Sequence, residues 1–119
     1  MTLELILNHH YYRMIESGNK DEEYRRMCNH WKNRIWKNRD KINAVRFHKG
    51  YTSENMTFKV NSIRVGIGDE SLGAPTDEKV YIVSLGERID TAEQANEINK
   101  DCFLSVLHDD EENGNSDNN

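Results

Sequence analysis

Four short segments of the chain alternate apolar with polar residues or are mostly apolar, and such segments are typical of β-strands. They cover residues 2–7, 42–48, 56–67 and 79–85, and we interpret the densely charged residues 20–27 as a fifth strand. The alternation of the longest segment shifts near Asn61 and Ser62, which predicts a β-bulge. Residues 66–77 hold three of the seven glycines and the only proline, so we expect a loop there.

A helix is predicted near the start of the chain, over residues 9–17. Its apolar side chains recur at i, i+3 and i+4, and we expect them in the core: Tyr11, Met14 and Ile15. Asn8 can cap this helix by accepting a backbone N–H bond. Gly18 follows the last turn, where a left-handed conformation costs glycine nothing. Residues 28–41 have no clean period and predict either a short helix or a long loop.

The end of the chain is interpreted separately from residues 1–90. Asp90 with Glu93 resembles a capping box, which predicts a helix over 91–99 or longer. Residues 109–119 contain only Asp, Glu, Asn, Gly and Ser, so we expect a disordered acidic tail. The predicted organisation is one domain at 1–90, a C-terminal helix within 91–108 packed on or beside it, and the tail. The predicted class is α+β: a small β-barrel of about five or six strands with two or three peripheral helices.

Composition argues against a membrane or secreted protein. The apolar runs are far shorter than the roughly 20 residues that a spanning helix needs, so we expect no membrane partner. The first residues lack the basic start and apolar stretch of a secretory signal. Two cysteines, Cys28 and Cys102, do not make a disulfide framework, and a reducing cytoplasm is the expected location.

Charge is distributed unevenly along the chain. Residues 1–50 carry 11 Lys and Arg against 6 Asp and Glu, whereas residues 51–119 carry 5 against 15; the formal net charge is −5. The basic part therefore keeps an anionic partner open although the whole chain is acidic. One basic run suits a surface that contacts phosphates or, equally, a solvated loop: Arg25, Arg26, Lys32, Arg34, Lys37, Arg39 and Lys41.

The most informative segment begins where the predicted helix ends. Its pattern is Gly-x-Lys-x-x-Glu-x-Arg, formed by Gly18, Lys20, Glu23 and Arg25. In this pattern and in its strand–helix–strand context, the chain resembles the ASCH domain family of the PUA-like superfamily. Two further patterns are similar to those of small, often phage-encoded members: Trp31-x-x-Arg34 and Arg46-Phe47-x-x-Gly50-Tyr51. The resemblance implies a PUA-like β-barrel over residues 1–90 that recognises RNA or a modified nucleoside in a cleft.

The residue types are consistent with that chemistry. On a strand Glu23 and Arg25 share a face, and Lys20 joins them only if the chain turns at the strand start. The guanidinium of Arg25 suits a phosphate or a base edge, and the carboxylate of Glu23 can accept a bond from an exocyclic amino group. The candidate nucleic-acid-binding residues are Lys20, Glu23, Tyr24, Arg25, Trp31, Arg34 and Arg46, with the two aromatic rings as stacking platforms for an unpaired base. The expected partner is single-stranded RNA, a nucleotide or a nucleoside.

Other interpretations stay open at this point. The three charges could form a solvated cross-strand cluster, and Trp31 and Trp36 could anchor the core. Some relatives look like amidohydrolases that deacylate N4-acetylcytidine and others are reported as nucleases, which would make Lys20 and Glu23 catalytic. However, the amidohydrolase pattern has Thr where Glu23 stands. A third alternative is an interaction or inhibitor protein acting through the acidic tail. No metal-ligand spacing or cofactor motif is present, so we expect neither a metal nor a cofactor.

Overall fold

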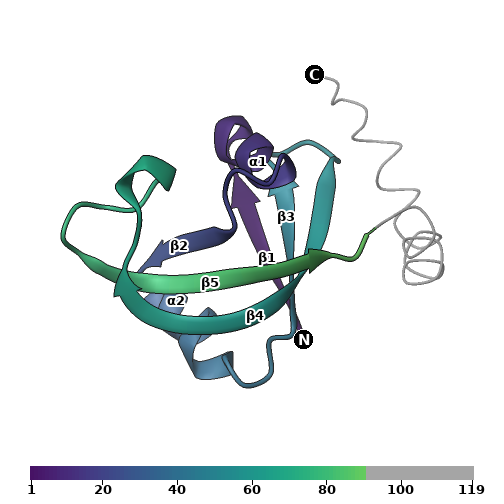
Figure 1. Ribbon diagram of the computed structural model, residues 1–119. Coiled ribbons are helices and arrows are strands. Elements are labelled where there is room, and N and C mark those ends of the chain that lie inside the picture. The colour runs from purple at the N-terminus through teal and green to yellow at the C-terminus, as the bar shows by residue number, and fades with distance from the viewer. Residues whose placement is uncertain (91–119) are drawn as a thin grey trace.

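The computed structural model describes residues 1–90, which form an α+β fold around one curled sheet (Figure 1). The elements are β1 (Thr2–Leu7), α1 (His9–Glu16), β2 (Glu22–Arg26), α2 (Asn29–Arg34), η1 (Trp36–Asn38), β3 (Ala44–Lys49), β4 (Asn55–Ile67), η2 (Glu70–Leu72) and β5 (Lys79–Arg88), where η marks a short 3-10 helix. All five predicted strands are present. Residues 28–41, for which the sequence predicts either a short helix or a long loop, contain α2 followed by η1.

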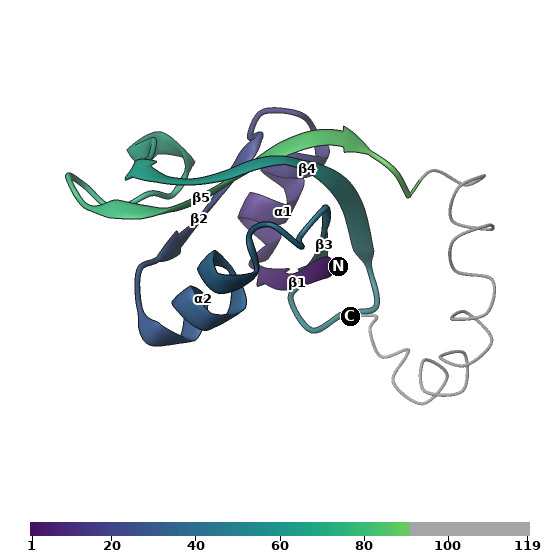
Figure 2. The same cartoon turned by 90° about the horizontal axis from the view of Figure 1, so that it is seen from below.

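The five strands form one mixed sheet in the order β1-β3-β4-β5-β2. β1 and β3 are parallel, and the other neighbours are antiparallel. The long strands β4 and β5 curve across the molecule, so the sheet formed by residues 1–90 curls into a half-barrel with β1 and β2 as its edge strands (Figures 1 and 2). The pairing of β4 with β5 shifts register between Phe58 and Val60 and again between Val60 and Ser62, which confirms the predicted bulge.

The main core lies on the concave side of the curled sheet. Its side chains come from alternate positions of the strands, together with α1 and the α2–η1 segment: Leu3, Leu5, Leu7, Tyr12, Ile15, Ile35, Ile42, Val45, Phe47, Met56, Phe58, Tyr81, Val83 and Leu85. A second cluster formed by Tyr24, Ala74, Val80 and Ile82 covers the opposite face of β2 and β5. Residues 80–83 of β5 are buried on both faces of the sheet, so this part of the strand is continuously apolar rather than alternating.

The predicted core face of α1 is partly wrong. Tyr12 and Ile15 are the buried residues of this helix, whereas Tyr11 and Met14 are only half-buried. The sequence predicts that the face formed by Tyr11, Met14 and Ile15 is buried. In the structure the neighbouring face, formed by Tyr12 and Ile15 at positions i and i+3, packs against the sheet. Tyr11 instead faces the η2 turn, where its ring lies against Gly73.

The end of α1 sets the position of the residues that follow. The Asn8 side chain accepts a bond from the Tyr11 N–H, as predicted for the N-cap. Gly18 has φ +87°, the left-handed conformation expected after the last turn. The Lys20 N–H then returns to the Met14 carbonyl at 3.1 Å, so the chain turns before β2 begins at Glu22.

The segments predicted after residue 90 lie outside the described residues: the helix within 91–108, its capping box with Glu93, and the tail 109–119. Asp90 itself accepts two bonds from the Arg88 guanidinium, at 2.6 and 3.2 Å. Within residues 1–90, no helix combines the length and the apolar character needed to cross a membrane.

Candidate functional site

Lys20, Glu23 and Arg25, here named the charged triad, meet at the β2 edge of the half-barrel. The Lys20 Nζ lies 3.4 Å from Glu23 Oε1, and the Arg25 Nε donates to Glu23 Oε2 at 2.9 Å. Glu23 pairs with Val83 of β5, which faces the main core, so its carboxylate is buried with 6% of the side chain exposed. The turn after Gly18 places Lys20 beside Glu23; because side chains alternate along a strand, the three charges can meet only if the chain turns at this point. A buried carboxylate between two cations is electrostatically compensated.

The Lys20 ammonium is enclosed rather than free. It donates to the Leu72 carbonyl on η2, and it lies 4.4 Å from the ring centroid of Tyr11 and 5.0 Å from that of Tyr24. Burial lowers the pKa of Lys20, and the adjacent Glu23 carboxylate opposes that shift. Lys20 therefore links η2 to the start of β2, and its positive charge interacts with groups of the protein itself: the Leu72 carbonyl, the Glu23 carboxylate and the two tyrosine rings.

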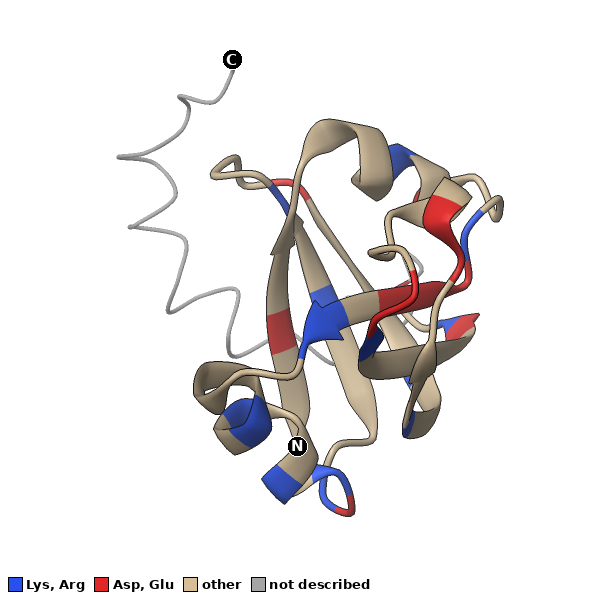
Figure 3. Cartoon of the chain, turned by 90° about the vertical axis from the view of Figure 1, so that its left-hand side faces the viewer, with Lys and Arg blue, Asp and Glu red and all other residues tan. Residues whose placement is uncertain are grey.

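Arg25 bridges the two edges of the sheet. While its Nε binds Glu23, its Nη2 donates to the Ile6 carbonyl of β1 at 3.0 Å. Its guanidinium carbon lies 4.8 Å from the centroid of the Trp31 indole on α2. Figure 3 shows the acidic start of β2 and its basic end, which lies next to β1. The fixed donors of a guanidinium allow these two bonds and the stacking contact at once.

A cleft of about 410 Å³ opens beside the triad. One side is formed by Glu23, Tyr24, Arg25 and Arg26 of β2, with Cys28 and Trp31; the other is formed by Gly73, Ala74, Pro75 and Val80. Ligand pockets in proteins usually have volumes of roughly 300–1,000 Å³, so the cleft is large enough for a nucleoside-sized molecule. Lys20 is not among the residues that line it.

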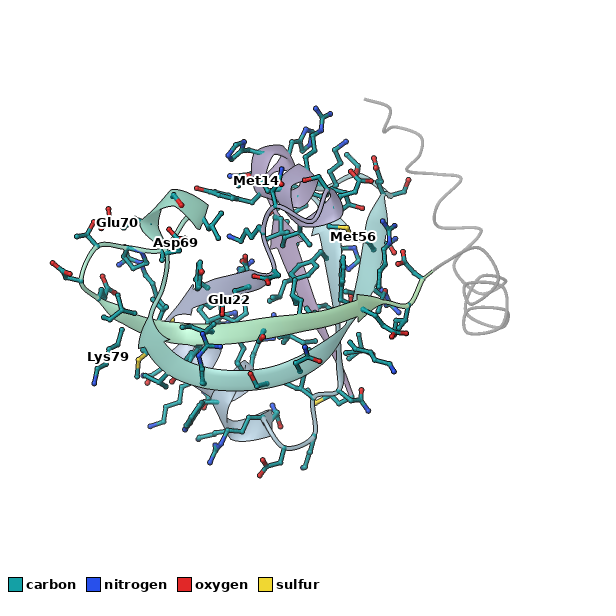
Figure 4. The ribbon with its side chains drawn as sticks, in the orientation of Figure 1. Met14, Glu22, Met56, Asp69, Glu70 and Lys79 are labelled. Carbon is teal, nitrogen blue, oxygen red and sulfur yellow. The ribbon has the colours of Figure 1, made fainter. Side chains whose placement is uncertain are left out.

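Tyr24 lies on the convex face of β2 and has a polar partner. Its hydroxyl donates to Glu22 Oε1 at 2.9 Å, and the other Glu22 oxygen accepts from Arg64 at 2.7 Å. Burial, with the nearby Glu22 and Asp69 carboxylates, raises the pKa of Tyr24 to about 12, so the phenol stays protonated at neutral pH. The bond from Arg64 lowers the pKa of Glu22. In Figure 4, Glu22 lies on β2, and Asp69 and Glu70 lie on the connection to β5.

The remaining candidate residues lie farther along the same side of the molecule. Arg34 contacts the Trp31 ring at 5.4 Å and donates to the Glu4 carbonyl. Arg46 donates to the Glu4 carboxylate at 2.8 Å and does not line the cleft. The structure therefore gathers Lys20, Glu23, Tyr24, Arg25 and Trp31 around one site and places Arg46 outside it. The basic residues of α2 and the following turn are exposed: Lys32, Arg34, Lys37, Arg39 and Lys41.

Gly73 holds the wall of the cleft close to α1, and its replacement tests this contact. Its φ is +104°, and a Cβ there would lie 2.9 Å from Tyr11 Cζ. Gly73→Ala is expected to lower the free energy of unfolding by about 2–3 kcal/mol, measured by urea denaturation, because backbone strain adds to a steric clash. Gly18→Ala is the matched control, since φ is +87° there with no atom within 4 Å of a Cβ; about 1 kcal/mol is expected. If the two variants lost the same free energy of unfolding, the predicted steric clash between residue 73 and Tyr11 would be contradicted.

Several residues near the site were missed by the sequence interpretation. They are Tyr11 under the Lys20 ammonium, the Leu72 carbonyl, and residues 73–75 on the far wall of the cleft. A loop sequence does not reveal where its backbone will lie, so nothing in the chain could have identified residues 72–75. Tyr11 was recognised as apolar but assigned to the core.

The described residues contain no group of three or more His, Cys, Asp or Glu side chains that could hold a metal ion. No protein-family model, curated protein or solved structure matches the chain.

Proposed function

We propose that the chain is a small ASCH-type domain with a PUA-like half-barrel, and that its cleft binds a nucleotide of single-stranded RNA. The observation that carries this proposal is the Arg25–Trp31 stack at the wall of the 410 Å³ cleft. A guanidinium held by Glu23 and Ile6 is already ordered, so binding a ligand costs little additional side-chain entropy. The indole beside it offers an aromatic surface of the kind on which unpaired bases stack.

The polar groups around the cleft suit the two ends of a nucleotide. Glu23 and residues 73–75 line the same space as the cations Arg25 and Arg26. A carboxylate accepts bonds from exocyclic amino groups, and guanidinium groups bind phosphate. The exposed basic residues of α2 lie next to Trp31 along the chain and suit the phosphates of a longer strand.

The geometry favours binding over hydrolysis by Lys20 and Glu23. The ammonium of Lys20 donates to the Leu72 carbonyl and contacts Glu23, and it is enclosed by two tyrosine rings. A nucleophile or general base must reach the reacting atom, and Lys20 does not line the cleft. In this proposal Lys20 holds the wall of the cleft in place, and Glu23 and Arg25 meet the ligand.

Titration of a short single-stranded RNA and of nucleoside 5′-monophosphates into the protein tests this function. Trp31→Ala is expected to weaken binding of both ligands by about tenfold, because it removes the stacking surface. Arg26→Ala is also expected to weaken both, and to reduce the salt dependence of RNA binding. Arg39→Ala is the matched control, since this exposed arginine lies 4.2 Å over Trp36 and does not line the cleft. Wild-type affinity of both Trp31→Ala and Arg26→Ala would contradict the proposal.

A further inference from the structure

A second and larger cavity lies on the other side of the Arg25–Trp31 stack. We name this cavity of about 670 Å³ the outer groove. Its lining comes from the outer face of β1 and β3, from α2 and its N-terminal end, and from the turn that joins β3 to β4. Arg25 and Trp31 line both the outer groove and the cleft, so the two cavities share a wall.

The aromatic residues of the outer groove are open to solvent. Tyr51, on the β3–β4 turn, is 94% exposed, although it is a large aromatic residue on a well-packed domain. His30 also lines the groove, is exposed and lies edge-on to Trp31, with ring centroids 4.4 Å apart. Ile6 of β1 adds an exposed apolar surface to the groove. Exposed rings with an apolar floor are the composition of sites that bind unpaired bases by stacking.

The charges of the outer groove favour an anionic ligand. Among residues 1–90, Glu4 is the only carboxylate that lines it, and its two oxygens are bound by Arg46 Nη1 at 2.8 Å and by His48 Nε2 at 2.6 Å. Because these two partners offset the charge of Glu4, the guanidinium groups of Arg25 and Arg34 are the remaining charged groups that face the groove. Within residues 1–90, Arg34 donates a single hydrogen bond, to the Glu4 carbonyl at 3.2 Å, so further N–H groups are available to a phosphate.

We propose that the outer groove is a second nucleotide subsite, so that two consecutive nucleotides of one RNA strand bind on the two sides of the Arg25–Trp31 stack. This inference rests on the proposed function of the cleft. The shared wall supports this inference, because a strand that places one base in the cleft beside Trp31 can continue into the outer groove by crossing Arg25 and Trp31. The guanidinium groups of Arg25 and Arg34, 4.8 and 5.4 Å from the same indole ring, then flank the connecting phosphate.

The test compares RNAs of one, two and three nucleotides by isothermal titration calorimetry. The dinucleotide is expected to bind about tenfold more tightly than the corresponding nucleoside monophosphate, because a second base gains a stacking partner. Tyr51→Ala is expected to remove most of this gain and to leave the affinity for the monophosphate unchanged. Tyr51→Phe keeps the ring and is expected to keep the gain. Because Tyr51 is almost fully exposed on a turn, neither substitution should unfold the protein.

The outcomes separate this inference from the proposed function. If the monophosphate binds and Trp31→Ala weakens it, the cleft works as proposed. Equal affinities of the monophosphate and the dinucleotide would then overturn the second subsite alone. A loss of the same factor for both ligands in Tyr51→Ala would overturn it as well, since Tyr51 would then act on the cleft. Absence of binding by either ligand to the wild-type protein would contradict both proposals.

Discussion

Glu23→Gln is expected to lower the free energy of unfolding by about 3 kcal/mol, because it leaves the buried Lys20 and the half-buried Arg25 without their shared counter-ion. The carboxylate is only 6% exposed and lies between Lys20 Nζ, 3.4 Å away, and Arg25, whose nitrogens approach to 2.9 Å. A glutamine can accept one of these bonds but cannot balance the charges. Urea denaturation of the purified variant measures the loss as a shift of the midpoint at unchanged slope.

Glu22→Gln is the control for this prediction, because it changes the neighbouring carboxylate in the same way. Glu22 is 25% exposed and pairs with the solvent-facing Arg64, so a loss of less than about 1 kcal/mol is expected. Adding Lys20→Met to Glu23→Gln removes one of the two uncompensated cations. The double variant should therefore be more stable than the sum of the single losses predicts. Equal losses for Glu22→Gln and Glu23→Gln would contradict the role assigned to the charged triad.

The second large effect concerns the guanidinium group of Arg25. Arg25→Lys keeps the positive charge, yet it is expected to lower the free energy of unfolding by about 2 kcal/mol. A single ammonium cannot reach Glu23 and the Ile6 carbonyl and also contact the Trp31 ring, as the guanidinium does at 2.9, 3.0 and 4.8 Å. The contact between the two edges of the sheet is then weakened.

Hydrogen exchange identifies where Arg25→Lys acts. Amides of β1 and β2 should exchange faster in the variant, whereas those of the central pair β3 and β4 should keep their protection. Arg26→Lys is the matched control: this neighbour is 73% exposed and its nearest carboxylate oxygen, on Glu78, is 4.0 Å away. Wild-type stability and exchange in Arg25→Lys would show that the bridge between β1 and β2 contributes nothing.

The local pattern of the sequence predicted most of the strands and the geometry around Gly18. Alternation located β3 and β4, mostly apolar runs located β1 and β5, and the shift near Asn61 located the bulge, because these features depend on neighbouring residues. The same local reasoning required a turn before β2 to bring Lys20 to Glu23, and this turn is present.

The rest of the site depends on contacts between distant parts of the chain. Tyr11 lies outside the core because its ring packs against Gly73, which follows η2 about sixty residues later, and against the Lys20 ammonium. The pairing of Glu4 with Arg46 follows from the parallel register of β1 and β3, which alternation within either strand does not reveal. For the same reason the sequence alone does not show that Arg46 binds Glu4 and is not among the residues that line the cleft.

The strand order also sets the sequence in which the protein can assemble during synthesis. β1 pairs with β3, and β2 pairs with β5, whose first residue is Lys79. A nascent chain that ends before Lys79 has no ladder partner for β2, so the charges of Glu23 and Arg25 stay in water until the chain has reached β5. The residues that would recognise the ligand are encoded early, yet they can be buried only after almost all of the described domain has been made. Folding of this edge is therefore expected to be the slow, late event.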